Sequence, residues 1–250
     1  MSWVITGSQK VNWDPSLTTT SLWLDATANE TVFSDAGTTQ ATNGGTVQQW
    51  KDKKNNGLIF SQATSGNRPS YNTSAINSKA GVSFTTGKFL AGTRPFAGTG
   101  ALFFVQQVPS DTEYIWIGAN TSSPYLYVAQ SGDAQSFTAS VGTPTFWANG
   151  VINSWSTRND IWAGLGANAV LLSVTNADLA SFTGEMRISG YQNNSNIFSI
   201  SDGFMSEIIA ISGTVQTFER QRVEGYLAHK WGLTANLPSN HPYKVNPPAP

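Results

Sequence analysis

Apolar residues follow two different spacing patterns along this chain, and the pattern changes in its last quarter. Residues 207–212 form a short, largely apolar run, which indicates a strand. From residue 217 onward the apolar positions recur at steps of three and four, the spacing of one helix face. They are Val223, Tyr226, Leu227 and Trp231. Because a helix of about four turns is marginal alone in water, we expect this stripe to dock on the rest of the protein.

Both ends of the predicted helix carry recognisable signals. Thr217 is the expected N-cap, and Glu219 places negative charge in the first turn. His229 and Lys230 fall in the last turn, and Gly232 stands where a left-handed C-terminal cap is expected. The sequence therefore predicts a helix over residues 217–232, followed by an extended Pro-containing tail over residues 234–250.

The chain before the helix consists of short apolar runs separated by turn residues. Residues 22–25 form a first core strand, and residues 27–46 are rich enough in turn residues to predict a long surface loop. Asn55-Asn56-Gly57 predicts a hairpin turn, and residues 82–84 and 89–90 are expected to form another short pair. The later predicted strands are 101–108, 114–118, 125–129, 136–141, 161–164, 170–174, 186–190, 197–200 and 207–212.

This regular cadence of strands and turns is typical of a sandwich or barrel. We predict an all-β protein, a two-sheet antiparallel sandwich over residues 21–212 with one short C-terminal α-helix, folded as a single domain over residues 1–250. Residues 101–108 are nearly continuously apolar in their first half, which favours a central strand buried on both faces. Residues 1–20 are a polar lead with isolated apolar anchors, either an edge strand or an arm onto a neighbour.

The C-terminal block also carries a family resemblance. EGYLAHKWGL, followed by LP and HPY, resembles the end of laminin-G-like domains of the concanavalin A-like jelly-roll superfamily. LWLDA at 22–26, WKDK at 50–53, NRPSY at 67–71 and GVSF at 81–84 are similar to that family's opening strands. The resemblance covers roughly residues 20–243 and implies a jelly roll. Such domains occur in bacteriophage virion proteins and in some bacterial surface proteins.

Charge is sparse and balanced. Charged residues make up 12% of the chain, and 14 basic side chains face 15 acidic ones for a net charge of −1. Nucleic-acid binding needs a concentration of Lys and Arg, so we expect no nucleic-acid partner. A neutral surface of this kind is typical of β-rich proteins that live in assemblies or touch sugars, and equally of a plain polar sandwich.

The sequence disfavours disulfide bonds, secretion through a signal peptide and insertion into a membrane. Without cysteine there is no disulfide and no thiolate metal site. The first residues lack the charged and apolar regions of a secretory signal peptide, and no apolar run approaches the roughly 20 residues of a membrane span. We therefore expect synthesis in a host cytoplasm without a signal peptide, no membrane insertion, and a place in a virion.

Catalytic patterns are not evident. The Glu-x-Asp-x-x-Glu run of jelly-roll glucanases does not occur, and Glu185 and Glu207 each stand alone in their strands. His229 and His241 are interpreted as structural. We expect no enzymatic activity, no catalytic residue, no cofactor and no metal ligand, although some laminin-G-like domains bind one calcium ion through scattered oxygen ligands, so the resemblance keeps a weak calcium site open.

Aromatic residues are the positive signal, at 12% of the chain. Around residues 114–127 they alternate with aliphatic residues, so one face of each strand is aromatic. That face is either part of the core or an outer platform for a sugar or a partner protein. A second group lies in a Gly/Asn-rich stretch without strand alternation and is the better candidate for a loop contact. The candidate contact residues are Trp116, Tyr125, Tyr127, Phe146, Trp147 and Trp155.

Three functions follow from these observations. The first is a non-enzymatic bacteriophage virion component, a head-decoration, tail or fibre protein whose partners are copies of itself and other virion proteins. The second is a carbohydrate-binding adhesin module that recognises host or environmental polysaccharide, including cell-surface glycan, through the aromatic platform. The third, a hydrolase, would need two carboxylates to converge in a groove.

Overall fold

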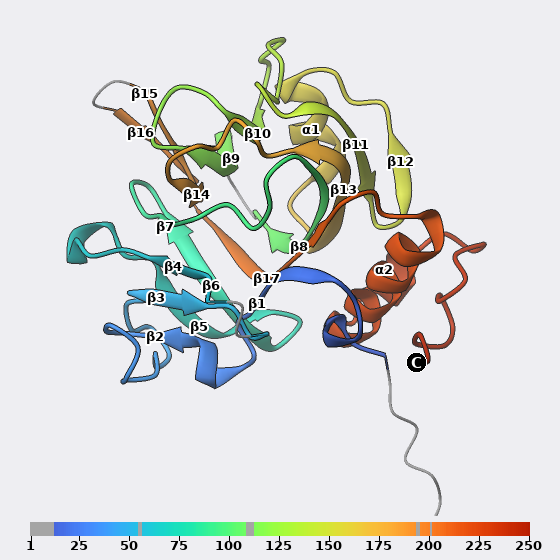
Figure 1. The fold of residues 1–250 in the computed structure, drawn as a ribbon, viewed down its shortest axis with the longest axis horizontal. Coiled ribbons are helices and arrows are strands. Elements are labelled where there is room, and N and C mark those ends of the chain that lie inside the picture. The colour runs from blue at the N-terminus through green and yellow to red at the C-terminus, as the bar shows by residue number, and fades with distance from the viewer. Residues whose placement is uncertain (1–12, 55–56, 109–112, 194–195, 201) are drawn as a thin grey trace, which may run out of the picture.

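Two antiparallel β-sheets face each other and enclose the main apolar core (Figure 1). The computed structural model describes residues 13–54, 57–108, 113–193, 196–200 and 202–250. The predicted all-β, two-sheet sandwich with a C-terminal helix is confirmed.

The first sheet contains the long strands. β17 is its organising strand, because it pairs with β8 along one edge and with β6 and then β1 along the other. In spatial order the strands are β12 (Val151–Asn153), β11 (Gly142–Ala148), β13 (Val170–Asp178), β8 (Thr99–Gln107), β17 (Asp202–Ser212), β6 (Lys79–Thr85) and β5 (Ser70–Ile76), with β1 (Thr20–Asp25) beside β17.

The second sheet is built mostly from short strands. In spatial order it contains β10 (Tyr125–Gln130), β9 (Glu113–Ala119), β14 (Met186–Ile188), β7 (Leu90–Gly92), β4 (Ile59–Ser61), β3 (Gln49–Lys51) and β2 (Val32–Phe33). The remaining elements are the hairpin β15 (Tyr191–Asn193) and β16 (Asn196–Phe198), the helices α1 (Arg158–Leu165) and α2 (Thr217–Trp231), and the 3-10 turns η1 (Pro15–Leu17), η2 (Asn29–Thr31), η3 (Ser65–Asn67) and η4 (Thr234–Asn236).

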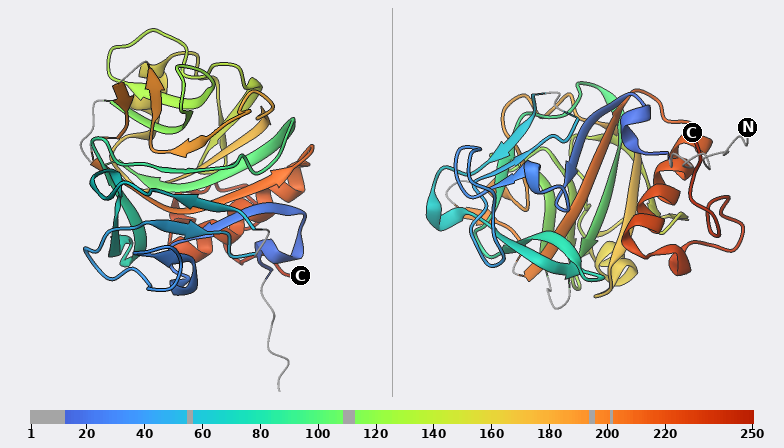
Figure 2. Two further views of the ribbon diagram at one scale, coloured as in Figure 1. Left: turned by 60° about the vertical axis from the view of Figure 1, so that its left-hand side comes forward. Right: turned by 90° about the horizontal axis from the view of Figure 1, so that it is seen from below.

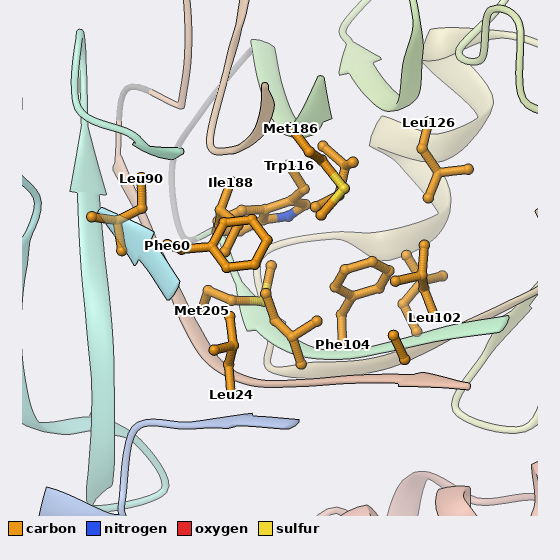
Figure 3. Packing of buried hydrophobic residues seen from close by; sticks show 14 of the residues in the cluster. Leu24, Phe60, Leu90, Leu102, Phe104, Trp116, Leu126, Met186, Ile188 and Met205 are labelled. Atoms are coloured by element: carbon orange, nitrogen blue, oxygen red, sulfur yellow. The ribbon is translucent and has the colours of Figure 1, made fainter. Parts of the chain in front are cut away.

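Strand β8 is buried on both faces, as its composition predicts. Leu102 and Phe104 point into the core between the sheets, where Figure 3 shows them opposite residues of the second sheet. Ala101, Phe103 and Val105 point the other way, into a second apolar cluster under α2. This two-sided burial explains the continuous apolar run, because a strand covered by a sheet on one side and a helix on the other needs apolar residues at every position.

Helix α2 covers the outer face of the first sheet, and Figure 2 shows it beside the long strands. Val223, Leu227 and Trp231 of the predicted stripe are buried in the second cluster, and Tyr226 is half-buried against it. Gly232 has a φ of 70°, as a left-handed cap requires. The N-terminal end of α2 is capped as well.

The N-cap of α2 is Gln216, one residue before the expected Thr217. The Gln216 side chain accepts from the backbone of Glu219, whose carboxylate in turn accepts from the Gln216 N–H at 2.8 Å. This reciprocal pair satisfies two helix-end donors at once. Thr217 is therefore the first residue of the helix and not its cap.

A second helix corrects the expectation of a single one. Residues 161–164 were expected to be a strand, yet they lie within α1. Thr157 is its N-cap and accepts from the Asp160 N–H, while the Asp160 carboxylate accepts from the Thr157 N–H at 2.8 Å. The Thr-x-x-Asp spacing is a helix-start signal, and it outweighs the short apolar run that follows it.

Residues 136–148 contain another correction. Residues 136–141 form no strand and contribute only an isolated bridge at Ala139, whereas β11 and β12 form a hairpin just after them. Asn149 and Gly150 make its turn with φ values of 49° and 80°. Asn-Gly is the preferred pair for such a turn, so this sequence signal was present and was missed.

Local pairing in the first third of the chain is partly as expected. β3 pairs with β4, which confirms the hairpin predicted around residues 55–57, although residues 55 and 56 lie outside the described residues. The expected pairing of residues 82–84 with 89–90 is wrong, because β6 belongs to the first sheet and β7 to the second. The intervening residues therefore carry the chain from one layer to the other.

The described part of the N-terminal lead packs on its own chain. Trp13 is buried, and its backbone N–H donates to the Pro248 carbonyl at 3.2 Å. The tail is held in turn by Lys244, whose ammonium donates to the carbonyls of Thr234, Ala235 and Leu237. Residues 1–12 lie outside the described residues, so the choice between edge strand and arm is open for them. No helix among the described residues has the length and apolar character needed to cross a membrane.

Candidate functional site

Two carboxyl groups and one ammonium group meet beneath α2. Asp25 on β1 and Glu207 on β17 are register partners on adjacent strands. Lys230 of α2 reaches down between them, and its Nζ lies 2.7 Å from Asp25 Oδ2 and 2.7 Å from Glu207 Oε2. The two carboxylate side chains are 1% and 0% exposed. The Nζ contacts lack hydrogen-bond alignment, so they are close electrostatic contacts.

Glu207 is held by aromatic donors as well. The indole N–H of Trp23 donates to Oε1 at 2.7 Å, and that of Trp231 donates to Oε2 at 2.6 Å. The Tyr226 hydroxyl donates to Oε1 at 3.3 Å. Both carboxylate oxygens therefore have donors, which is what a buried charged group requires.

Asp25 is held from a different side. Its Oδ1 accepts from the Thr27 N–H at 3.0 Å and from the Thr27 hydroxyl at 2.6 Å. Its Oδ2 accepts from Lys53 Nζ at 2.8 Å. The Lys53 ammonium also lies over the Trp23 ring, 4.2 Å from its centroid, a cation–π contact that fixes the lysine above the carboxylate.

The two carboxyl groups have different acidities. Burial opposes ionisation of Asp25, but Lys230 and Lys53 outweigh it and hold the pKa of Asp25 below its ordinary value. Burial raises the pKa of Glu207, because that side chain is more completely enclosed and the neighbouring Asp25 charge adds to the effect. Glu207 is therefore the member of the pair that takes up a proton more readily.

This convergence bears on the hydrolase hypothesis. A glycosidase needs two carboxyl groups that reach the same sugar, whereas Asp25 and Glu207 are covered by α2 and committed to internal donors. Sequence reasoning missed the pair because the two residues are far apart along the chain. The available signs were an acidic residue at the end of the first core strand, Asp25, and another directly before the apolar run 208–211, Glu207.

A second buried ionic cluster fastens the tail to α2. Glu224 accepts from Arg220 at 2.7 Å through both oxygens and from the Ser173 hydroxyl at 2.9 Å. His241 Nε2 lies 3.2 Å from the same carboxylate, and His229 Nε2 lies 2.9 Å from the Tyr243 carbonyl. Both histidines therefore join the tail to the helix. The described residues contain no cluster of three or more His, Asp or Glu side chains suited to a metal ion.

Of the first group of candidate contact residues, Trp116 belongs to the core and not to a surface platform. Trp116 is wholly buried between the sheets (Figure 3). Its ring lies edge-on to that of Phe84, with centroids 6.1 Å apart. Tyr125 is half-buried beside Tyr191, with ring centroids 5.6 Å apart. The side chain of Tyr127 lies outside the described residues. The burial of Trp116 therefore removes one member of the expected platform.

Two members of the second group, Phe146 and Trp147, lie on strand β11, whereas Trp155 lies in the loop between β12 and α1. Phe146 on β11 is buried between Phe137 and Trp155, at centroid distances of 4.8 and 6.1 Å. Trp147 points to the opposite face, where the Arg220 guanidinium stacks 3.6 Å from its ring centroid. Trp155 is half-buried against the main core. These rings serve packing and the second ionic cluster.

Comparisons of the chain with protein-family models, curated proteins and solved structures found no match. The laminin-G-like resemblance therefore stays a prediction.

Two exposed apolar side chains border a pocket beside Trp13. Leu17 and Phe218 are 56% and 59% exposed, and they border a pocket of about 270 Å³ between η1 and the start of α2. Trp13 and Val223 form part of its lining. We call this pocket, lined also by Thr18, Thr19, Ile211, Glu219 and Arg222, the Trp13 pocket. Large exposed apolar side chains that lie together mark a docking surface more often than single exposed ones do.

A larger and entirely different depression lies at the other end of α2. It has a volume of about 610 Å³ and is lined by five Asn and Gln residues together with small and aliphatic residues. The amides are Asn77, Gln107, Asn149, Asn168 and Asn236. Five separate parts of the chain supply them, and none of the lining residues is charged. We call this depression the amide cleft.

Proposed function

We infer that the protein is a non-enzymatic structural component of a bacteriophage particle that acts by self-association or by docking on other virion proteins. The observation that carries this proposal is the Trp13 pocket with its two exposed apolar side chains, Leu17 and Phe218. The family resemblance supports the placement in a virion, and the balanced charge fits a partner that is held by apolar contact.

The N-terminal lead supplies a natural occupant for this pocket. Its sequence contains Trp3, Val4 and Ile5 in otherwise polar surroundings, and the chain joins the described structure at Trp13, which itself lines the pocket. Twelve residues span up to roughly 40 Å when extended, enough to reach a neighbouring copy. Each large apolar side chain buried contributes about 1.5–3 kcal/mol, so a single arm binds weakly and many copies bind firmly.

Solution mass tests the proposal. Light scattering at micromolar concentration should show a discrete oligomer for the full chain, and a smaller species both after removal of residues 1–12 and in the Leu17→Ser/Phe218→Ser variant. Val245→Ser is the matched control, because Val245 is 80% exposed but lies outside the pocket. A full chain that is monomeric, or an oligomer that survives both changes, would contradict self-association through this pocket. Quantitative mass spectrometry of gradient-purified particles should find the chain in many copies.

The amide cleft supports a second function, the binding of neutral glycan. Amide groups both donate and accept hydrogen bonds, as sugar hydroxyls do, and the uncharged lining favours a neutral ligand. This differs from the aromatic platform expected from the sequence. Asn168 and Asn236 are exposed and make no side-chain hydrogen bond to described residues, so Asn168→Ala/Asn236→Ala should fold normally.

A glycan array tests this second function. Protein displayed on tetrameric streptavidin should bind neutral glycans, the Asn168→Ala/Asn236→Ala variant should bind at least tenfold less, and Asn120→Ala, which alters an exposed asparagine at the end of the second-sheet strand β9, should match the parent. Binding that persists in the double variant, or that is confined to acidic glycans, would rule the cleft out.

A further inference from the structure

The buried cluster beneath α2 has the composition of a reaction centre, which simple ion pairing does not require. The Lys230 amine touches the carboxyl groups of both Asp25 and Glu207. The N–H and hydroxyl of Thr27 donate to Asp25 Oδ1, the oxygen that the amine does not touch. We propose that Lys230 and Asp25 condense into an intramolecular isopeptide bond, with Glu207 as the group that relays the protons. This inference does not depend on the proposed function.

The nucleophile and the electrophile are already in contact. Lys230 Nζ lies 2.7 Å from Asp25 Oδ2, so little motion brings it to the adjoining Cγ atom. The strand and the helix that carry the two residues are fixed by the surrounding apolar cluster. Fixing two reactants in a near-attack arrangement is equivalent to a very high local concentration, which makes an amide accessible that free amine and carboxylate do not form in water.

Donors stand where negative charge would develop. When the amine adds to Cγ, Oδ1 becomes an oxyanion, and the Thr27 N–H and hydroxyl already donate to it at 3.0 and 2.6 Å. Lys53 Nζ lies 2.8 Å from Oδ2, the oxygen that would leave. Preorganised donors of this kind stabilise the tetrahedral intermediate of acyl transfer.

Glu207 is placed to act as the catalytic base and acid. Its Oε2 lies 2.7 Å from Lys230 Nζ, and the indole N–H groups of Trp23 and Trp231 hold the carboxylate in position.

The reaction balances without any added reagent. The Lys230 ammonium carries three protons. Nζ forms a bond to Cγ of Asp25, and the bond between Cγ and Oδ2 breaks. One proton stays on the new amide nitrogen, and two are relayed through Glu207 to Oδ2, which leaves as water. Glu207 ends in the state in which it began, and nothing is oxidised or reduced.

The physical setting favours the product. The interior disfavours isolated charges, and condensation replaces one positive and one negative charge with a neutral amide. The bond would also join β1, near the start of the chain, to α2, near its end, and so hold most of the polypeptide in one covalent loop. A loop of that length restricts the unfolded chain strongly, which suits a protein exposed to mechanical or chemical stress.

Intact-mass spectrometry of the denatured protein tests the proposal. The parent should be about 18 Da, one water, lighter than its sequence, and digestion should yield one branched peptide joining Lys230 to Asp25. Lys230→Arg retains the positive charge but lacks the reacting amine, and should show its full sequence mass. Glu207→Gln retains both reacting groups, and should show the loss in less than a tenth of molecules.

The control is Lys79→Arg, which alters a lysine outside the cluster and should show the same loss of water as the parent. A parent protein at full sequence mass after prolonged incubation in the folded state would overturn the proposal. A branched peptide that joins Lys230 to Glu207, or Lys53 to Asp25, would overturn the assignment of the reacting residues. Full reaction in Glu207→Gln would overturn its catalytic role.

Discussion

Asp25 and Glu207 lie opposite each other in register on strands β1 and β17, and a single lysine of α2, Lys230, reaches an oxygen of each at 2.7 Å. Two like charges on neighbouring strands would repel each other in a core. Lys230, Lys53 and the two indole N–H donors compensate these charges. The same contacts hold α2 and the first sheet in one orientation.

Replacing Lys230 should be costly. Compared with Lys230→Arg, which keeps the positive charge and does not condense, Lys230→Met leaves Glu207 with its indole donors but without its cation, and breaking a buried pair by removing one partner costs about 3–5 kcal/mol. Urea denaturation at pH 7 measures the loss. Glu207→Gln placed in the same chain should recover part of it, because no charge is then left uncompensated. Lys79→Met, a lysine without an ion pair among the described contacts, should stay within about 0.5 kcal/mol of the parent.

The cap of α1 should be sensitive to acid. Hydrogen bonds from the backbone N–H groups of Ser156 and Thr157 lower the pKa of Asp160 from 3.8 to about 2. Because the folded pKa lies below the unfolded one, the stability this cap contributes is complete above about pH 4 and is lost as the pH falls towards 2. A carboxyl-carbon NMR titration should give a midpoint near 2. A midpoint at the ordinary aspartate value would show that the cap does not form in solution.

Trp116 should behave as a core residue. Because it is wholly buried between the sheets, Trp116→Ala should cost about 3–5 kcal/mol in unfolding free energy. Ile152→Ser is the comparison, since Ile152 is 56% exposed and its replacement should cost little. A Trp116→Ala protein with parental stability that had lost glycan binding would restore the platform that the burial of this ring argues against.

The tail should be released when His241 is removed. His241→Ala takes away the contact with the buried Glu224 carboxylate, and a hydrogen bond to a charged group is worth about 1.5–3 kcal/mol. Limited proteolysis should then cut the tail faster than in the parent, and Asn246→Ala, an exposed tail residue, should leave the rate unchanged. Equal cleavage rates in all three proteins would mean that the contact between His241 and Glu224 does not hold the tail.

Local signals explain which elements were predictable. The stripe of α2 and the cap at Gly232 depend on residues three to four positions apart, so periodicity reveals them. The same reasoning missed α1 because its eight residues are too few to establish a period. It also placed Trp116 without deciding its face, since alternation separates the two faces of a strand but does not say which of them meets the other sheet.

The amino-acid sequence by itself determined that this protein is a β-sandwich closed by a docked C-terminal helix, because strand alternation and helix periodicity are properties of neighbouring residues. Only the tertiary structure decided that Asp25, Glu207 and Lys230 share one buried site, that Trp13 meets Pro248, and that five amides line one cleft. Those contacts join residues far apart in the chain. The register and layering of strands create them, and no local pattern encodes which distant strands become neighbours.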